Sequence, residues 1–224
     1  MAEELKTRDM HYRSYVGPPE RYDLISAMVF NLMTCLGLRE HHTVIDVGCG
    51  SLRNGRLLIP YLNPENYIGV EPNKWLVDAG IKNETGKDII NIKKPTFIYN
   101  DNLNSIDCVA DFVLAQSIFS HTGLNLFDNW LASISSRLHN NGILLATVVE
   151  GVDYKGEGWV YPGCVTYRKD TIKSLAKNNN FEFTSLNFKH PAQQWVAFYK
   201  EGFCEDLLQN DITWNMLISS IYSI

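Results

Sequence analysis

The residues best suited to chemistry lie in one segment, Val44-Ile-Asp-Val-Gly-Cys-Gly-Ser-Leu-Arg-Asn-Gly55. Its apolar start predicts a buried β-strand, which then breaks into a glycine turn that opens a helix. Gly48 and Gly50 carry no Cβ, so the chain can turn sharply and a ligand can approach the backbone closely. In this geometry a backbone can lie against an adenosine-type cofactor.

Two further positions decide which cofactor suits the turn. A dinucleotide fingerprint needs a third glycine three residues after the second, and Arg53 stands there instead. Asp46 precedes the first glycine by two residues, and its carboxylate would repel a pyrophosphate but favour a cationic ligand. A nucleoside that carries a sulfonium and an ammonium therefore fits better than NAD.

Ile45-Asp-Val-Gly-Cys-Gly50 resembles the first motif of the class I S-adenosylmethionine-dependent methyltransferases. A second match is Asn66-Tyr-Ile-Gly-Val-Glu-Pro72, in which Glu71 lies 21 residues after Gly50. An acidic residue about 20 residues after the glycines accepts hydrogen bonds from ribose hydroxyls in the nucleotide-binding versions of this fold. The alternative is a fortuitous strand, turn and helix.

The resemblance implies S-adenosylmethionine as cofactor and S-adenosylhomocysteine as its product. The glycine turn would hold the amino-acid part, and Asp46 would orient that turn or receive the ammonium. Glu71 would hold the ribose, Pro72 would face the adenine, and Asp101 or the amide of Asn102 would meet the adenine amino group. The alternative for Asp101 is an ordinary loop residue. The expected cofactor-binding residues are Asp46, Gly48, Cys49, Gly50, Glu71, Pro72, Asp101, Asn102, Gln116 and Ser117.

Gln116-Ser-Ile-Phe-Ser-His-Thr122 is similar to the motif after the fourth strand of many small-molecule methyltransferases, whose backbone lines the cleft at the methyl group. His121 is the candidate general base, because histidine titrates near neutral pH. The alternative is that His121 packs and hydrogen-bonds to hold this loop.

Three aromatic residues lie on a long glycine-rich loop at 151–163: Tyr154, Trp159 and Tyr161. Such a loop suits a substrate lid, or a cation–π cage for an amine, or it is a surface loop with anchoring aromatics. Tyr15 is a further candidate for acceptor binding. It belongs to an amino-terminal arm that either folds over the cofactor or is mobile.

Composition excludes several classes. The 224-residue chain is 45% hydrophobic and has a net charge of −5 with no long basic run, so nucleic acid is disfavoured as a partner. Five widely spaced cysteines without a C-x-x-C pair indicate reduced thiols, and no residue constellation indicates a metal site. The start is charged and lacks a signal-like stretch, and the apolar run at 24–38 is too short for a membrane span. We therefore expect a cytoplasmic protein.

The rest of the chain alternates helices and strands. Helices are expected at 21–36, from the glycine turn to about 64, from 73 to 86, at 127–138 with a stop at Asn140-Asn-Gly142, and at 171–178. Strands are expected at 43–47, 67–70, 97–99, 110–115, 143–149, 181–188 and 195–199. The short loop between the last two favours an antiparallel pair.

These elements predict an α/β fold. Its resemblance implies a Rossmann-like methyltransferase sandwich, with a mainly parallel sheet of about seven strands, a carboxyl-terminal antiparallel hairpin and helices on both faces. Residues 1–200 would form a single domain, with an arm and helix at 1–38. Residues 201–224 are rich in apolar side chains and would dock on the domain or form a homodimer.

The expected function is methyl transfer from S-adenosylmethionine to an oxygen or nitrogen of a small molecule: a metabolite, sugar or natural product. A dehydrogenase is disfavoured by Arg53 and Asp46. Two alternatives stay open: a non-catalytic nucleoside-binding scaffold, and a protein or peptide methyltransferase.

Overall fold

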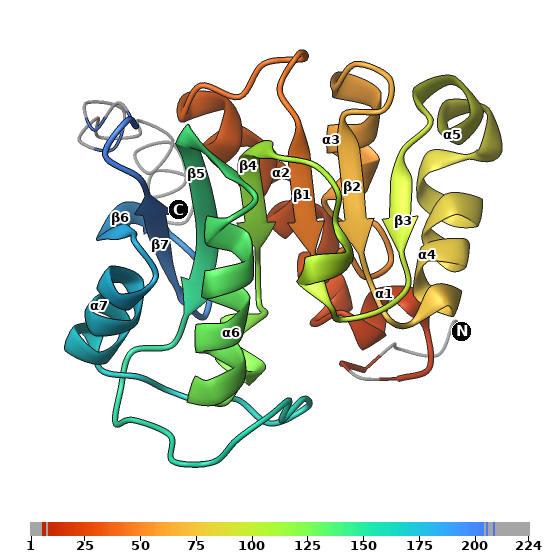
Figure 1. Ribbon diagram of the computed structural model, residues 1–224. Helices are drawn as coiled ribbons and strands as arrows, with labels where there is room; N and C mark the ends of the chain where they lie inside the picture. Colours follow the sequence, from red (N-terminus) through yellow and green to blue (C-terminus); the bar gives the residue numbers. More distant parts are fainter. Residues whose placement is uncertain (1–5, 8, 204, 206–207, 209–224) are drawn as a thin grey trace, which may run out of the picture. The chain divides into compact units, whose positions relative to one another are not determined.

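The computed structural model describes residues 6–7, 9–203, 205 and 208 (Figure 1). The chain divides into two compact units. The first consists of residues 1–34 and 38–112, and the second of residues 35–37 and 113–224. The expected docking segment at 201–224 falls almost entirely outside the described residues, so its role stays a prediction.

The strands form one seven-stranded mixed sheet in the order β3-β2-β1-β4-β5-β7-β6. Strands β1, β2 and β3 pair in parallel, whereas β7 is antiparallel to both β5 and β6. The expected α/β fold with a terminal antiparallel hairpin is therefore confirmed. The strands are β1 (Val44–Val47), β2 (Tyr67–Val70), β3 (Thr96–Ile98), β4 (Ala110–Ala115), β5 (Leu138–Val148), β6 (Glu182–Lys189) and β7 (Gln194–Tyr199).

In the first unit, β1 and β2 are buried along their whole length, as parallel strands covered on both faces should be. Figure 1 shows α2 and α3 behind these strands. The unit's helices are α1 (Tyr12–Tyr15), η1 (Pro19–Arg21), α2 (Tyr22–Cys35), α3 (Gly55–Tyr61), α4 (Lys74–Gly80), a π-helical turn η2 (Ile81–Thr85), α5 (Lys87–Lys93) and η3 (Leu103–Ser105).

One glycine of this unit is required by close packing. A Cβ on Gly80, at the end of α4, would collide with the carbonyl oxygen of Ser51 in the glycine turn. The absence of that Cβ lets the end of α4 press its backbone against the glycine turn.

The second unit is built around phenylalanine rings. Phe119 stacks on Phe127 with ring centroids 3.9 Å apart, and Phe198 of β7 meets both rings edge-on. In Figure 1, α6 lies in front of β5. The helices of this unit are η4 (Phe119–His121), α6 (Leu124–Ser135) and α7 (Lys169–Asn178).

The stop signal at Asn140-Asn-Gly142 was misplaced. Helix α6 ends at Ser135, and these residues instead belong to the start of β5. Contacts distant in sequence hold them extended: Lys200 Nζ donates to the carbonyl of Leu138 at 2.7 Å, and Gly202 packs against the carbonyl of Asn140. Tertiary contacts here override a local turn signal.

The helix expected at 73–86 is divided into α4 and the π-helical turn η2. Trp75 is 37% exposed because the buried face of α4 is formed by its neighbours Leu76 and Val77. Asn73 stands at the cap position, but its side chain makes no capping bond and donates to Glu71 instead. No pattern in the sequence indicated α5, which has no buried residue. Among the described residues, none of the helices is long and apolar enough to cross a membrane.

Candidate functional site

The glycine turn of the first unit has the geometry that its sequence predicts. Gly48 and Gly50 adopt positive φ angles of 69° and 55°, which glycine accepts without a steric cost. The backbone N–H groups of Gly48 and Cys49 both donate to the carbonyl of Val70, at 2.8 and 3.1 Å. The end of β2 therefore holds the turn that follows β1.

Glu71 lies directly beside this turn. Its side chain is almost buried, and Oε2 accepts a hydrogen bond from the backbone of Gly50 at 3.2 Å. Oε1 accepts from the backbone and the side chain of Asn73, both at 2.8 Å. Desolvation raises the pKa of Glu71, and these hydrogen bonds oppose the rise. The two motifs therefore contact each other. The Glu71 carboxylate, 21 residues after Gly50, is fixed against the backbone of the glycine turn.

Asp46 is 1% exposed and lies within β1, where its Oδ2 accepts the hydroxyl of Tyr67 at 2.7 Å. Desolvation raises the pKa of Asp46 to about 7, while the Tyr67 hydrogen bond and the charge of Arg53 act in the opposite direction. A carboxylate so deeply buried stabilises the turn from within the sheet. Its burial favours the orienting role over direct reception of an ammonium.

The amino-terminal arm covers the turn, a contact that sequence reasoning left open. Val16 would meet a Cβ built on Gly50 at 2.7 Å, so the two residues touch. Arg53 donates from Nη1 to the carbonyl of Val16 at 2.9 Å, and Tyr22 donates to the carbonyl of Ser51 at 2.9 Å. Arg53, which stands where a dinucleotide fingerprint needs glycine, is thus used to hold the arm.

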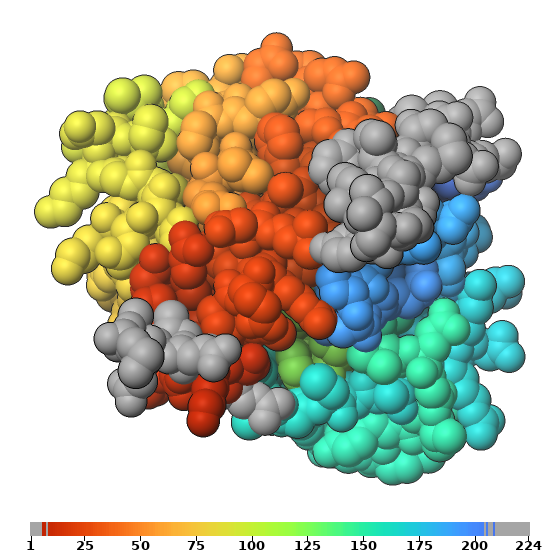
Figure 2. All heavy atoms as spheres, turned by 180° about the vertical axis from the view of Figure 1, so that it is seen from behind, coloured from red at the N-terminus to blue at the C-terminus, as the bar shows by residue number. Residues whose placement is uncertain are grey.

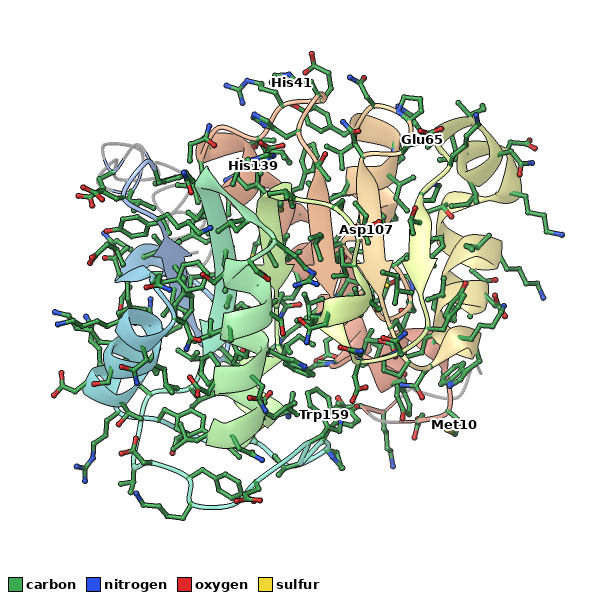
Figure 3. All side chains as sticks on the ribbon, viewed as in Figure 1. Met10, His41, Glu65, Asp107, His139 and Trp159 are labelled. Atoms are coloured by element: carbon green, nitrogen blue, oxygen red, sulfur yellow. The ribbon has the colours of Figure 1, made fainter. Side chains whose placement is uncertain are left out.

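The position of the arm is visible in two views. In Figure 3, Met10 lies at the opposite end of the first unit from His41 and Glu65, which precede β1 and β2. In Figure 2 the red amino-terminal spheres adjoin the yellow spheres of the α4 region. Tyr15 meets Trp75 of α4 edge-on, with ring centroids 5.2 Å apart. The arm therefore lies at the carboxyl ends of β1 and β2, and Tyr15 lies in the same unit as the cofactor motifs.

The remaining expected cofactor residues of this unit are exposed. Pro72 follows Glu71 at the surface, and Asp101 and Asn102 lie on the turn after β3. The side chain of Asn102 accepts from the backbone of Asn104 at 3.0 Å, which caps η3. The carboxamide oxygen of Asn102 thus has a structural use, whereas Pro72 presents an apolar ring to solvent.

His121 belongs to the second unit and is nearly buried. Its Nδ1 lies 2.6 Å from the carbonyl of Gly163. A carbonyl can only accept, so Nδ1 carries the hydrogen, and in the neutral ring Nε2 is the basic nitrogen. This one contact serves both expectations for His121: it holds the loop, and it selects the tautomer that a base at Nε2 needs.

The aromatic residues of the long loop separate into two groups. Trp159 and Tyr161 stack with centroids 6.2 Å apart, and the His121 ring meets both edge-on at 5.7 and 5.1 Å. Tyr154 instead folds back on Gly156 of its own loop. In Figure 3, Trp159 lies at the opposite end of this unit from His139, near the start of β5. Two of the three aromatics expected here form one cluster with His121.

Backbone hydrogen bonds fix this loop. Gly123 donates to Gly158 at 2.7 Å, and Val160 donates to His121 at 2.8 Å. The Asp153 carboxylate accepts from the backbone of Arg168 at 2.8 Å. These bonds favour a fixed wall over a hinged lid.

Gln116 and Ser117 follow β4 in the second unit. Both residues belong to a polar cluster with Thr147 and Gln193. Sequence reasoning missed Gln193, because it lies on a loop far along the chain and carries no local motif. Within the described residues, no group of three histidine, cysteine or acidic side chains is arranged to hold a metal ion.

Comparisons with known proteins find similarity only at the level of structure. No family model matches the sequence, and no curated protein matches it. A crystal structure of magnesium protoporphyrin IX methyltransferase from Synechocystis PCC 6803 with bound SAM aligns with a TM-score of 0.58 at 14% identity, over 81% of this chain and 79% of that chain.

Two further solved structures are similar to the same extent. An S-adenosylmethionine-dependent methyltransferase from Clostridium acetobutylicum ATCC 824 aligns with a TM-score of 0.59 at 10% identity, over 79% of this chain and 90% of that one. Mitomycin 7-O-methyltransferase aligns with a TM-score of 0.58 at 13% identity, over 81% of this chain and 58% of its own. The chain therefore has the fold of the class I S-adenosylmethionine-dependent methyltransferases, as its two motifs predicted.

Proposed function

We propose that this protein is an enzyme that transfers a methyl group from S-adenosylmethionine to an oxygen or nitrogen of a small molecule. The observation that carries the proposal is the Glu71 carboxylate bonded to the backbone of Gly50. It combines a fixed acceptor for ribose hydroxyls with an open glycine turn, on the fold that the solved methyltransferases share.

The residues of the first unit fit this cofactor. A ribose hydroxyl can donate to the remaining lone pair of Glu71 on Oε2, whose orientation three donors already determine. The backbone of Gly48, Cys49 and Gly50 would bind the amino-acid part, with Asp46 beneath it. Pro72 offers an apolar face for the adenine. Asp101 or Asn102 would accept a hydrogen bond from the adenine amino group. Tyr15, a candidate for acceptor binding, is equally able to contact the cofactor from its place beside Trp75.

The residues of the second unit would serve the acceptor. The sulfonium supplies an already activated methyl carbon, so the protein has mainly to orient the nucleophile. His121 would take the proton of a hydroxyl or ammonium at Nε2, with Nδ1 held by Gly163. Trp159 and Tyr161 offer apolar ring faces, and the backbone of Gln116 and Ser117 would line the methyl end.

The neighbours support a small-molecule acceptor. By their names, two of the aligned methyltransferases act on magnesium protoporphyrin IX and on mitomycin. The negative net charge of this chain disfavours a nucleic acid. A cytoplasmic location and a homodimer through residues 201–224 belong to the proposal as well. A protein substrate and a non-catalytic scaffold remain the alternatives.

Calorimetric titration with S-adenosylmethionine and S-adenosylhomocysteine, with NAD as the negative control, tests the cofactor. The decisive variant is Glu71→Gln, and its matched control is Glu65→Gln at the other end of β2 (Figure 3). We expect both sulfur nucleosides to bind, and Glu71→Gln to weaken binding by about 1–3 kcal/mol, because hydrogen bonds to a charged group are lost. Glu65→Gln should bind as the wild type does.

Methyl incorporation from labelled cofactor into small acceptors then separates an enzyme from a scaffold. Binding of NAD alone would refute the proposal, since the chain would then be a dinucleotide protein. Binding of S-adenosylhomocysteine with no methyl transfer to any small molecule, peptide or protein would favour the scaffold.

A further inference from the structure

Ser117 has an unusual backbone conformation at the end of β4. Its φ angle is +59°, in the left-handed region that side chains other than glycine adopt at a cost of about 1–2 kcal/mol. Its backbone N–H donates to Oγ1 of Thr147 in β5 at 2.8 Å, which holds it there. Such strained positions concentrate at functional sites.

The Ser117 hydroxyl receives two hydrogen bonds. Gln116 Nε2 donates to Oγ at 3.1 Å, and Gln193 Nε2 donates at 2.8 Å. A serine hydroxyl has two acceptor positions and one hydrogen, so both acceptor positions are filled and the hydrogen is left to donate. No acceptor for that hydrogen is found among the described residues.

Two further polar atoms of the same region are enclosed without a hydrogen-bond partner in the described part of the chain: Gln193 Oε1 and Trp195 Nε1. Trp195 lies directly opposite Thr147 in the β5–β7 register, so their side chains share one face of the sheet. Reversing the Gln193 carboxamide would satisfy the Ser117 hydrogen but leave its Nε2 without a partner. In either orientation one end of the amide is unmatched.

The backbone that carries Gln193 is held in place. The loop between β6 and β7 is pinned by His190, whose Nδ1 accepts from the backbone of Ala192 at 3.2 Å and of Gln193 at 3.0 Å. Enclosed polar groups without a partner cost about 1–3 kcal/mol each, so folded proteins rarely keep several together unless water or a ligand completes them. A water or a ligand hydroxyl at this place would complete the hydrogen bonding of Gln193.

We propose that Ser117 and Gln193 form the polar end of the acceptor site and bind the neighbouring hydroxyls of a neutral sugar or cyclitol. This inference rests on the proposed function, because it names the substrate class of that site. The atoms offered are one donor, Ser117 Oγ, and one acceptor, Gln193 Oε1. Hydroxyls match such a mixture, since each one both donates and accepts.

Charged acceptors match these atoms less well. Among the described contacts, the side chains that hydrogen-bond to Ser117 and Gln193 are neutral, apart from the His190 ring that accepts from the Gln193 backbone. An ammonium would lack a carboxylate, and a carboxylate or phosphate would lack a cation and face the Gln193 oxygen. Trp159 and Tyr161 of the same unit present ring faces that suit the C–H surface of a sugar.

Ligand-observed NMR on the full chain saturated with S-adenosylhomocysteine tests the proposal directly. The probes are D-glucose, D-mannose, D-galactose and L-rhamnose, compared with inorganic phosphate and ethanolamine. We expect at least one sugar to bind and the two comparison compounds to bind more weakly.

Three variants locate the site. Ser117→Gly removes the hydroxyl but tolerates the left-handed backbone, and Gln193→Ala removes the amide; each should weaken sugar binding about tenfold. Gln193→Ala should leave the affinity for S-adenosylhomocysteine unchanged, because Gln193 is not among the expected cofactor residues. The matched control is Gln194→Ala, because the next glutamine instead donates to the carbonyls of Leu186 and Trp195. It should bind sugar as the wild type does.

Three results would overturn the proposal: no sugar binds, inorganic phosphate or ethanolamine binds more tightly, or Gln193→Ala leaves sugar binding unchanged. The last result would assign the enclosed atoms to a bound water. Failure of S-adenosylhomocysteine to bind would overturn the proposed cofactor, while sugar binding lost in Gln193→Ala would still support this site. The two failures are therefore distinguishable.

Discussion

Glu84, in the π-helical turn η2, is the residue whose replacement tests the arm most directly. Its side chain is 4% exposed, and Oε1 accepts from the hydroxyl of Tyr12 at 2.9 Å and from Nε of Arg13 at 2.8 Å. Oε2 faces Nη1 of Arg56 at 3.4 Å. Both guanidinium groups lie over the ring of Tyr22, at 4.6 and 5.5 Å from its centroid. One buried carboxylate thus joins the arm to two elements of its unit, η2 and α3.

The isosteric variant Glu84→Gln keeps the shape and removes the charge. Breaking a buried ion pair costs about 3–5 kcal/mol, because an uncompensated charge remains. Here Arg13 and Arg56 keep 28% and 21% exposure and Asp23 as a second partner, which lowers that cost. The new amide also turns an N–H group toward a guanidinium. We expect a loss of about 2–3 kcal/mol in the free energy of unfolding.

Urea unfolding followed by circular dichroism measures this loss, provided the slope of the transition is unchanged. The matched control is Asp78→Asn, which removes the same charge from an exposed pair with Lys74 and should leave the midpoint where it is. Trypsin should also cleave after Arg13 faster in Glu84→Gln than in the control, since the arm is released. Equal midpoints for the two variants would refute the reasoning that the buried carboxylate holds the arm.

Two further predictions concern the glycine turn. The pKa of Asp46 in the folded state, about 7, lies above the ordinary 3.8, so the folded protein keeps a proton that the unfolded chain releases. Stability should therefore fall as the pH rises between these two values, and Asp46→Asn should flatten the profile measured by urea unfolding; a wild-type profile already flat would contradict this. Gly50→Ala should destabilise the fold, through its positive φ and through the clash with Val16 Cγ1. Adding Val16→Ala should recover the part due to the clash, whereas additive losses in the double-mutant cycle would show that the two residues do not touch.

The local patterns predicted the elements well where one strong signal acted alone. β2 and β4 have the expected bounds, because continuous apolar runs flanked by turn residues leave few alternatives. The patterns failed where distant residues decide. Asn140-Asn-Gly142 lies in β5 because Lys200 and Gly202 hold it extended.

The sequence by itself determined the fold class and the pairing of the glycine turn with Glu71, because strand, turn and acidic residue are fixed by local composition and by spacing along the chain. Only the tertiary structure decided that Val16 lies on Gly50, that Arg53 holds the arm, and that Gln193 meets Ser117. These contacts join segments 34 to 76 residues apart, and no periodicity or spacing encodes them. They arise only when the packed elements bring side chains together. The glycine turn could therefore be predicted from the sequence, whereas the residues that contact it could not.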